Sequence, residues 1–597
     1  MAGEYWDRFW TTRRSRRKFL GGATAVGAGA AGIALVGCGG DSSSSSGGLA
    51  GLATPTPAAG ASPTKAADPF ANAKKGGAYQ MFATGDAPSI DPYGQGSFHT
   101  KTLAATVYSR LFKYNAGPGV AVKDLKAVPD AAASAEPSPD GLTWVVKLKP
   151  DLKFHNAPPV NGRQVTTEDV KASWARVMDP KSGVAGKVTW VDHLEYPDAT
   201  TIKFVLKEPH APFLDELADT NIFFIMPKEA DASATGFDPA KVMIGSGPWV
   251  FESYTPSVSY KFKKNPNWYM SGFPLMDTYT VNIIPQYATQ LAQFEAGSLD
   301  YVGITADDLV SVKNQFKSIT LYGEVSQLLS FLYFDSDPAS PWNKDPRVRQ
   351  AVSMALDRDG LTDLGYQVKK LRAAGLTVRG DWNNIIPAGL LRFWLDPKSA
   401  DMGEGGKYFK FDPAAAKALL SAAGVADGSI NTTYQYTANA YGAVFNSISE
   451  AQIQMINQIG IKTTTDVQDY NSKYKTQTFA GNFKGIAFGY ETPFPEAGGY
   501  ASAYLPGNAN NHSKINDPQL TELWKKQGAE LDLTKRKALF NQIQAYHATK
   551  MYYIPSQAGA GTGWGAWREW VMTNDIHTVP GSYGWPTELL PFFWKNQ

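Results

Sequence analysis

The chain of 597 residues is close to electrically neutral. It carries 57 Lys and Arg against 55 Asp and Glu, a formal net charge of +2, and 43% of its residues are hydrophobic. This balance gives no electrostatic footprint for a nucleic-acid partner, and the single cysteine, Cys38, excludes an internal disulfide framework. The length is sufficient for several domains around a large core.

The N-terminal segment has the features of an export signal. Basic residues that include Arg16 and Arg17 precede a Gly- and Ala-rich apolar run, residues 21–36, which is too short to hold a bilayer permanently. The arginine pair resembles a twin-arginine signal, and the four residues that end at Cys38 resemble a bacterial lipobox. We therefore expect residues 1–37 to be a cleaved signal peptide, exported by the twin-arginine or the general secretion route, and Cys38 to be lipidated.

A polar low-complexity tract follows the signal. Residues 38–75 combine the expected lipidated Cys with Gly, Ser, Ala, Thr and Pro and almost no aromatic residues, a composition typical of a flexible tether. The expected location is extracytoplasmic. A lipid anchor would hold the chain to the cell membrane, on the periplasmic or outer face of the cytoplasmic membrane.

Strand and helix patterns alternate along the rest of the chain. Residues 142–149 and 201–207 alternate apolar and polar side chains, which predicts two half-buried strands. Asp345, Asp412 and Asp517 each precede a proline, and this pair predicts a helix start with Asp as N-cap and Pro at the first helical position. The fold class predicted from these patterns is mixed α/β.

The sequence contains no recognisable catalytic constellation. The histidines are scattered, and none pairs with another His or with Cys at metal-ligand spacing: His99, His155, His193, His210, His512, His547 and His577. A nucleophile turn of the Gly-x-Ser-x-Gly type and a phosphate-binding GxxxxGK are also absent from the sequence. We therefore expect no enzyme activity, no metal site and no cofactor.

Blocks of sequence resemble a known family over nearly the whole chain that follows the tether. Taken in order, they are residues 128–155, 165–174, 245–249, 264–269, 294–300, 345–358, 411–420, 458–461 and 532–553. This series resembles the family 5 solute-binding proteins of ATP-binding-cassette importers, which include the oligopeptide- and dipeptide-binding proteins. Each block is weak alone, and their common order makes the resemblance specific.

Two of these blocks have a structural interpretation. Trp174 follows Val170 at helical spacing on an apolar stripe, which favours a core position over a ligand contact. Gly245 and Gly247 next to a proline predict a tight turn, which either lets the backbone approach another surface closely or is a turn alone.

The resemblance implies a two-lobed α/β fold of the periplasmic-binding-protein type II, with an extra third domain and a hinge between the lobes. By correspondence, lobe I comprises residues 76–118, 245–331 and 557–597, the small accessory domain residues 119–244, and lobe II residues 332–556. A ligand that contacts both lobes only when they are closed shifts an open-closed equilibrium.

The resemblance also suggests ligand-contact residues. Peptide binders of the family use a Trp-x-x-Asp carboxylate to pair with the amino terminus of the peptide, and Glu491 occupies the corresponding stretch here. If Glu491 lines a closed cleft, either the ligand is positively charged or the protein supplies a partner. The alternative is a surface-loop glutamate. Phe98, Trp382, Tyr490 and Phe494 are further candidates, with core packing as the alternative for each.

The expected function is capture of a peptide or a related small polar solute and its delivery to the membrane permease of an ATP-binding-cassette importer, by a monomer without a nucleic-acid partner. An oligosaccharide ligand within the same family is the first alternative. An extracellular enzyme and a sensor lipoprotein on the same fold are the others.

Overall fold

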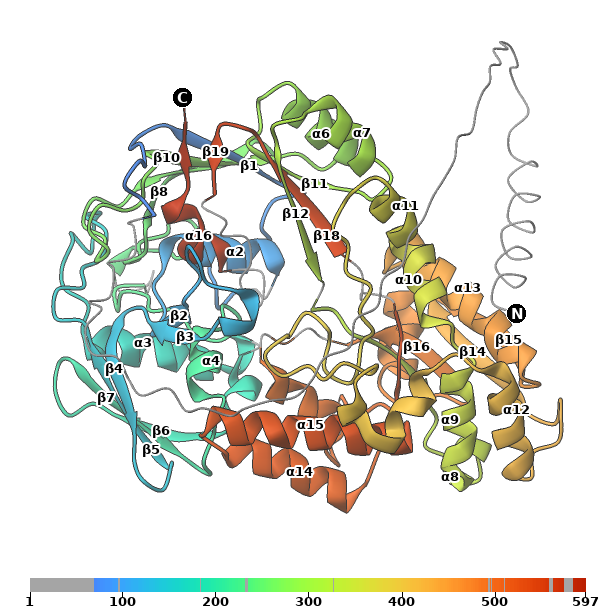
Figure 1. Ribbon diagram of the computed structural model, residues 1–597. Coiled ribbons are helices and arrows are strands. Elements are labelled where there is room, and N and C mark those ends of the chain that lie inside the picture. Colours follow the sequence, from blue (N-terminus) through green and yellow to red (C-terminus); the bar gives the residue numbers. More distant parts are fainter. Residues whose placement is uncertain are drawn as a thin grey trace, which may run out of the picture. The chain divides into compact units, whose positions relative to one another are not determined.

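The chain divides into two compact units, residues 1–72 and residues 73–597. The computed structural model describes residues 69–596 except 95–96, 183, 231–234, 326, 492–493, 495, 509, 558–561 and 574–583. All of the architecture below belongs to the second unit. Its strands and helices alternate along the sequence (Figure 1), so the predicted α/β class is confirmed.

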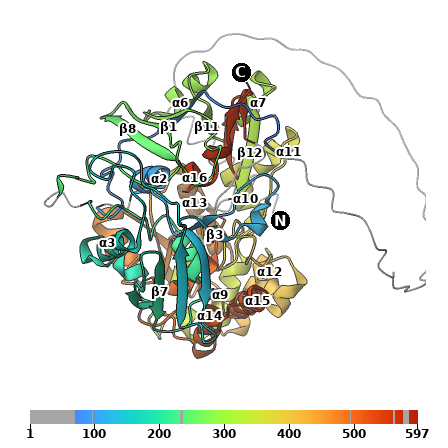
Figure 2. The ribbon, with the colours of Figure 1, turned by 90° about the vertical axis from the view of Figure 1, so that its left-hand side faces the viewer.

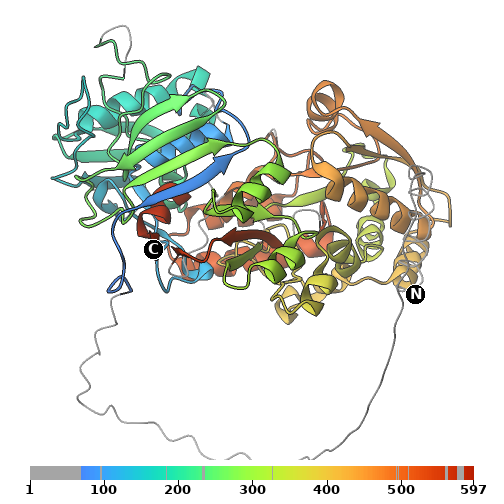
Figure 3. The ribbon, with the colours of Figure 1, turned by 90° about the horizontal axis from the view of Figure 1, so that it is seen from above.

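A four-stranded sheet contains the first strand of the chain. Its order is β1-β10-β9-β8, and its strands are Ala78–Ala83, Thr278–Ile283, Ser259–Lys264 and Trp249–Thr255. β1 and β10 run parallel, with Tyr79 opposite Tyr279, although the two strands lie far apart in the sequence. Figure 3 shows β1 in blue beside the green strands of this sheet.

A three-stranded sheet joins the middle of the chain to its C-terminal part. Its order is β11-β18-β12, and its strands are Tyr301–Ile304, Thr562–Trp567 and Thr320–Val325. The central strand β18, drawn in red in Figure 1, is antiparallel to both green neighbours. A small ribbon near the C-terminus pairs β19, Val571–Met572, with β20, Trp594–Lys595.

A second four-stranded sheet contains the two strands predicted from alternation. Its order is β4-β5-β7-β6, and its strands are Ala132–Pro137, Thr143–Leu148, Thr201–Leu206 and Val191–Glu195. β5 and β7 confirm that prediction. Helix α3, Thr167–Met178, packs on this sheet through Trp174, whose ring lies 5.7 Å from that of Phe204. Trp174 is buried, as its helical spacing predicted. A short ribbon pairs β2, Phe112–Tyr114, with β3, Ala127–Pro129.

A five-stranded mixed sheet completes the main architecture. Its order is β15-β14-β16-β13-β17, and its strands are Lys462–Gln468, Asn431–Thr437, Ile486–Tyr490, Ser330–Phe334 and Ile554–Pro555. β14 is parallel to β15 and β16, whereas β13 is antiparallel to β16 and β17. β13 is buried along its whole length, as expected for a strand inside a sheet.

The three predicted Asp-Pro helix starts are confirmed. They open α9, α12 and α14, at Pro346–Met354, Pro413–Ala422 and Pro518–Ala529. In each, the Asp carboxylate accepts a backbone N–H of the first turn, which would otherwise lack a partner. The other helices are α2 Phe98–Val107, α4 Phe213–Ala218, α6 Tyr287–Glu295, α7 Leu309–Gln315, α8 Pro341–Lys344, α10 Arg358–Tyr366, α11 Val368–Ala373, α13 Gly442–Gln458, α15 Leu533–Lys550 and α16 Trp585–Glu588. Helices α14 and α15 lie side by side in Figure 1 and Figure 2.

The turn at Gly245 and Gly247 approaches another backbone closely, as one of the two sequence interpretations predicted. A Cβ on Gly245 would lie 2.1 Å from the carbonyl oxygen of Val107, at the end of α2, so no other residue fits there. The Gly247 N–H donates to the same oxygen at 2.8 Å. His155 lies in the segment between β5 and α3, and its Nε2 lies 3.1 Å from the Gly247 carbonyl oxygen. The turn therefore fixes the end of α2.

Candidate functional site

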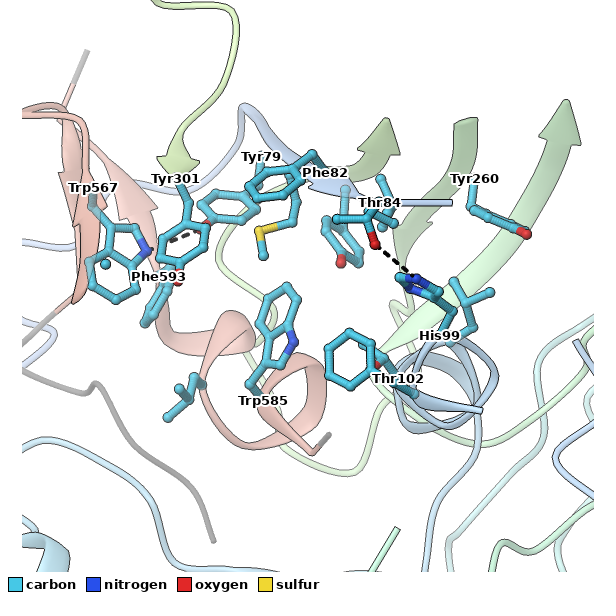
Figure 4. A pocket seen from close by; sticks show the side chains of 18 of the residues that line it. Tyr79, Phe82, Thr84, His99, Thr102, Tyr260, Tyr301, Trp567, Trp585 and Phe593 are labelled. Atoms are coloured by element: carbon cyan, nitrogen blue, oxygen red, sulfur yellow. Dashed lines mark hydrogen bonds between the residues drawn. The ribbon is translucent and has the colours of Figure 1, made fainter. Parts of the chain in front are cut away.

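A cavity of about 550 Å³ lies among β1, β10, β11, β12, β18, α2 and α16. Its walls are mostly aromatic, as Figure 4 shows, and they include Tyr79, Tyr260, Tyr301, Trp564, Trp567 and Trp585. The volume falls within the range of about 300 to 1,000 Å³ that is common for small-molecule sites. We refer to this space as the aromatic cavity.

Strand alternation explains how the walls form. Tyr79 and Met81 on β1 lie beside Tyr279 and Val281 on the parallel strand β10, so their side chains emerge on one face and line the aromatic cavity. On β18, Gly565 leaves the room that the Tyr301 ring occupies, because a Cβ there would lie 2.8 Å from the ring. The glycine and the tyrosine together shape this wall.

The polar groups of the cavity that have partners are neutral. The Trp567 indole N–H donates to the Tyr79 hydroxyl at 3.1 Å, and Thr84 Oγ1 lies 3.2 Å from His99 Nε2 (Figure 4). Burial raises the pKa of the Tyr79 hydroxyl well above its ordinary value and lowers the pKa of the His99 imidazole. Both shifts favour the uncharged form of the side chain.

Three other polar atoms of lining residues are buried without a hydrogen-bond partner in the described part of the chain. They are the hydroxyl oxygens of Thr102 and Tyr279 and the indole nitrogen of Trp564. Leaving such a group unsatisfied costs about 1 to 3 kcal/mol. Each is a neutral polar group of a lining residue whose hydrogen-bonding capacity is unused in this structure.

Glu491 does not lie on a surface loop, because its side chain is only 3% exposed. It follows β16, and its N–H donates to the Leu329 carbonyl oxygen at 2.8 Å. The Tyr333 hydroxyl donates to Glu491 Oε1 at 3.2 Å, and His512 Nε2 lies 3.4 Å from the same oxygen. A buried carboxylate needs a partner from either the ligand or the protein, and here the protein supplies the partner.

Aromatic rings surround this carboxylate. The His512 ring lies 4.0 Å from the Phe479 ring and 4.9 Å from the Tyr333 ring, and its Nδ1 faces the Phe479 carbonyl oxygen. Tyr333 belongs to a buried group that also contains the following side chains, and we call this group the packed cluster: Phe331, Tyr500, Tyr504, Trp524, Phe540 and Tyr553. The Glu491 carboxylate is thus held at the edge of a filled core.

Phe98 is the predicted ligand-contact residue that the structure places at the aromatic cavity. It lines the cavity at the start of α2, and 49% of it is exposed. Trp382 is 9% exposed and lies elsewhere, with its indole N–H donating to Asp359 Oδ1 at 2.7 Å. The ammonium of Lys398 lies 4.3 Å from the centre of the Trp382 ring.

Tyr490 and Phe494 flank Glu491 in the sequence, and neither lines the aromatic cavity. The Tyr490 ring lies 4.9 Å from that of Tyr441, and the Phe494 ring lies 5.1 Å from that of Tyr500. Gln327 links the aromatic cavity to the region around Phe494. It lines the cavity, and its backbone carbonyl oxygen accepts a hydrogen bond from the Tyr500 hydroxyl at 3.1 Å. The predicted residues therefore do not form one group.

Sequence reasoning missed most of the cavity lining. Tyr79 and Tyr279 sit at alternating strand positions, where an aromatic residue usually packs in a core. A weak signal was available in the Gly-Trp-Gly-Ala-Trp stretch from Gly563 to Trp567, because glycines inside a strand indicate close approach or open space.

Arg16, Arg17 and Cys38 lie outside the described residues, so the signal and lipid-anchor predictions stay predictions. Within the described ranges, no group of three or more His, Cys, Asp or Glu side chains could hold a metal ion. A search of the same residues finds no helix with the length and apolar character needed to span a membrane.

Known proteins are similar to this chain in sequence and in structure. The chain is similar to the glutathione-binding protein GsiB of Pectobacterium atrosepticum, with 25% identity over 385 residues that cover 64% of this chain and 67% of the relative. It is similar in structure to the ABC transporter substrate-binding protein CtaP of Listeria monocytogenes, with a TM-score of 0.71, 23% identity, and coverage of 88% and 100% of the two chains. A third likeness is to the periplasmic binding protein DppA of Helicobacter pylori in complex with the peptide STSA, with a TM-score of 0.65, 20% identity, and coverage of 88% and 99%.

These likenesses confirm the predicted periplasmic-binding-protein fold of type II. The family model described as "Bacterial extracellular solute-binding proteins, family 5 Middle" matches residues 126–512, which is more than half of the chain. The chain therefore belongs to the family 5 bacterial extracellular solute-binding proteins.

Proposed function

We propose that this protein captures peptides or a related small polar solute outside the cytoplasm and delivers them to the permease of an ATP-binding-cassette importer. The observation that carries the proposal is the family match over residues 126–512. Two relatives support the ligand class, since one is named for binding glutathione and another was solved with a bound peptide. A binding role rather than catalysis follows from the same membership.

We propose that capture works by hinge closure between the two expected lobes. The first two sheets draw their strands from residues 76–118, 245–331 and 557–597, and the sheet with β5 draws its strands from residues 119–244. The five-stranded sheet comes from residues 332–556, apart from β13, which begins just before this range. The strand content of the sheets supports the proposed division into two lobes and a small accessory domain.

We propose further that Cys38 carries a lipid that holds the protein to the membrane. The basic pair Arg16 and Arg17 and the short apolar run after it support this proposal. A Cys38→Ala variant should then appear in the soluble extracytoplasmic fraction, while the unmodified sequence stays with membranes. Equal membrane association of both proteins would contradict the anchor.

Glu491, Tyr490, Phe494, Phe98 and Trp382 remain the proposed ligand contacts, and Glu491 gives the sharpest test. Its place in the family pattern supports contact with an amino group, and its protein partners support a structural role. If it contacts ligand, Glu491→Gln weakens peptide binding about tenfold or more and leaves the unfolding temperature of the free protein nearly unchanged. A large loss of stability with unchanged peptide affinity would assign it to the scaffold.

An oligosaccharide is a second candidate ligand because the aromatic cavity favours it. Sugar rings stack on aromatic side chains, and their hydroxyl groups are neutral hydrogen-bonding partners for atoms such as Tyr279 Oη and Thr102 Oγ1. Peptides remain the first candidate because of the relatives.

The test is thermal unfolding of the full-length chain with pooled di- to pentapeptides and, separately, with pooled oligosaccharides. A ligand at about 100 times its dissociation constant adds about 2.7 kcal/mol of stability, which raises the midpoint by a few degrees in a chain of this size. A shift with peptides supports the proposal. A shift with sugars alone assigns the protein to the second candidate, and no shift with either overturns solute capture of both kinds.

A further inference from the structure

We propose that the aromatic cavity selects the ligand by accepting an uncharged ring that carries neutral hydrogen-bonding groups, and by excluding charged side chains. This inference rests on the proposed solute-binding function and names the chemical class that the site takes. For a peptide, the ring is an aromatic side chain such as that of Trp or Tyr. For a carbohydrate, it is the sugar ring.

The described lining of the aromatic cavity carries no charged side chain. Among the described residues that line the aromatic cavity, there is no Asp, Glu, Lys or Arg. A charged ligand group that enters such a space loses its water and gains no counter-charge, which is expensive. The cavity therefore discriminates against Lys, Arg, Asp and Glu side chains of a peptide.

One buried charge behind the cavity wall, Asp300, is already neutralised. Asp300, which lies beside Tyr79, pairs with the ammonium of Lys595 at 2.8 Å and accepts the Trp570 indole N–H at 2.7 Å. It also accepts the Gln80 N–H at 2.7 Å. These contacts leave Asp300 no role as a charge partner for a ligand in the cavity.

The rings that line the aromatic cavity are held in place by contacts with one another. The Tyr301 ring lies 4.9 Å from that of Trp567 and is stacked at 6.5 Å on that of Phe82. The Tyr79 ring lies edge-on to that of Phe593 at 6.2 Å. Because the walls already pack against one another, they offer preorganised aromatic faces, and a flat ring gains the most contact area from such walls.

Three buried polar atoms of the lining residues have no hydrogen-bond partner among the described residues, and all three are neutral groups. The Trp564 indole nitrogen can only donate, so it requires an acceptor such as a carbonyl, hydroxyl or ring oxygen. The hydroxyl groups of Thr102 and Tyr279 can donate or accept, and burial raises the pKa of Tyr279 well above its ordinary value, so this group stays neutral. All three atoms thus match neutral polar groups.

The test uses calorimetric titration of the full-length chain with matched probes. The tripeptides Ala-Trp-Ala, Ala-Tyr-Ala, Ala-Lys-Ala and Ala-Glu-Ala share length and termini and differ in the central side chain, and cellotriose supplies a sugar ring. We expect the aromatic tripeptides, cellotriose or both to bind at least about tenfold more tightly than the two charged tripeptides, because a charge in the cavity has no partner.

Two nearly isosteric variants test whether hydroxyl groups of the aromatic cavity contribute to binding. Thr102→Val and Tyr279→Phe each remove one unpartnered hydroxyl, and each should weaken binding of the preferred probe about 3- to 10-fold. Thr106→Val is the matched control, because Thr106 is buried on the same helix α2, does not line the cavity, and bonds to the Thr102 carbonyl oxygen. The unfolding midpoint of each free variant, measured alongside, shows that it is folded.

The outcomes separate this inference from the proposed function. Binding of Ala-Lys-Ala or Ala-Glu-Ala as tight as that of the aromatic tripeptides overturns the selectivity and leaves solute capture standing. Binding of cellotriose alone supports the uncharged ring and overturns the peptide assignment. Equal affinity of Thr102→Val, Tyr279→Phe and Thr106→Val for the preferred probe overturns the role of the cavity, and no binding of any probe overturns the function together with the inference.

Discussion

The aromatic cavity and the packed cluster are both built from aromatic side chains, and they differ in what the rings enclose. The rings of the cavity leave about 550 Å³ of space and three buried polar atoms without partners in the described chain. The rings of the packed cluster fill their space with one another and stand against Glu491 and His512, whose polar atoms face each other at 3.4 Å. Both regions contain buried polar atoms without a hydrogen-bond partner among the described residues, such as Tyr504 Oη and Trp524 Nε1 in the packed cluster, so the open space is what distinguishes them.

This difference shows that the space the rings leave open distinguishes a cavity wall from a core, whereas aromatic composition does not. The comparison can be tested by changing the polar partners in the packed cluster and the space in the cavity.

The largest expected effect comes from breaking the buried pair in the packed cluster. His512→Leu leaves the Glu491 carboxylate with the Tyr333 hydroxyl and no imidazole, and we expect the free energy of unfolding to fall by about 3 kcal/mol. Urea denaturation at pH 7 measures it. The double variant Glu491→Leu with His512→Leu should lose less than the single variant. A double variant that loses the sum of both single losses would show that the pair is not coupled.

A second prediction concerns the stability of the folded protein at acidic pH. Burial, with a smaller effect of Arg349, lowers the pKa of His547 to about 3, and the Tyr553 N–H donates to its Nε2 beside the packed cluster. In the unfolded chain His547 binds a proton near pH 6.5, whereas in the folded protein it stays neutral until the pH approaches 3. The contribution of this group to the free energy of unfolding is therefore complete above pH 6.5 and is lost as the pH falls towards 3. Between pH 7 and pH 5 the loss from this group is about 2 kcal/mol.

The matched variant for this prediction is His547→Gln, whose side-chain amide oxygen can still accept the Tyr553 N–H. Urea denaturation at pH 7 and pH 5 should show a smaller loss for the variant than for the original chain. An identical pH dependence in the two proteins would show that His547 does not titrate on unfolding in this range.

The smallest expected effect concerns the space in the aromatic cavity. Gly565→Ala places a Cβ 2.8 Å from the Tyr301 ring, which must shift, and we expect a loss of about 1 to 2 kcal/mol and a weaker affinity for the preferred ligand. Gly563→Ala, on the same strand and with no atom within 4 Å of its Cβ, is the control and should change stability by less than about 0.5 kcal/mol. Thermal unfolding measures the stability of the two variants, and calorimetry measures their affinity for the ligand. Equal values for the two variants would show that the Tyr301 ring moves aside at no measurable cost.

The sequence predicted the elements whose signals are local. Asp412 caps its helix because an Asp-Pro pair suits the first turn in any surroundings, and the alternation of β5 needs only the strand itself. The close approach at Gly245 was also predictable, because its cause is the missing side chain.

The cavity could not be predicted in this way, because it depends on partners far apart in the sequence. Tyr79 lines the cavity and Tyr434 is buried in a core, yet both are tyrosines inside a strand and both are 1% exposed or less. Only the register of β1 against β10 and the position of β18 decide which ring faces open space. The burial of Glu491 has the same origin, because β13 and the residues around His512 supply its surroundings.

The bond between the Trp567 indole and the Tyr79 hydroxyl joins residues 488 positions apart, and the Arg110 guanidinium reaches Glu588 over 478 positions. Segments from the two ends of the second unit thus come together, and Tyr79 and Trp567 belong to the same cavity wall. A ribosome must release almost the whole chain before this wall exists, and long-range closure of this kind is slow. A nascent or C-terminally truncated chain therefore has no finished cavity. The aromatic cavity is therefore completed at a late stage of folding.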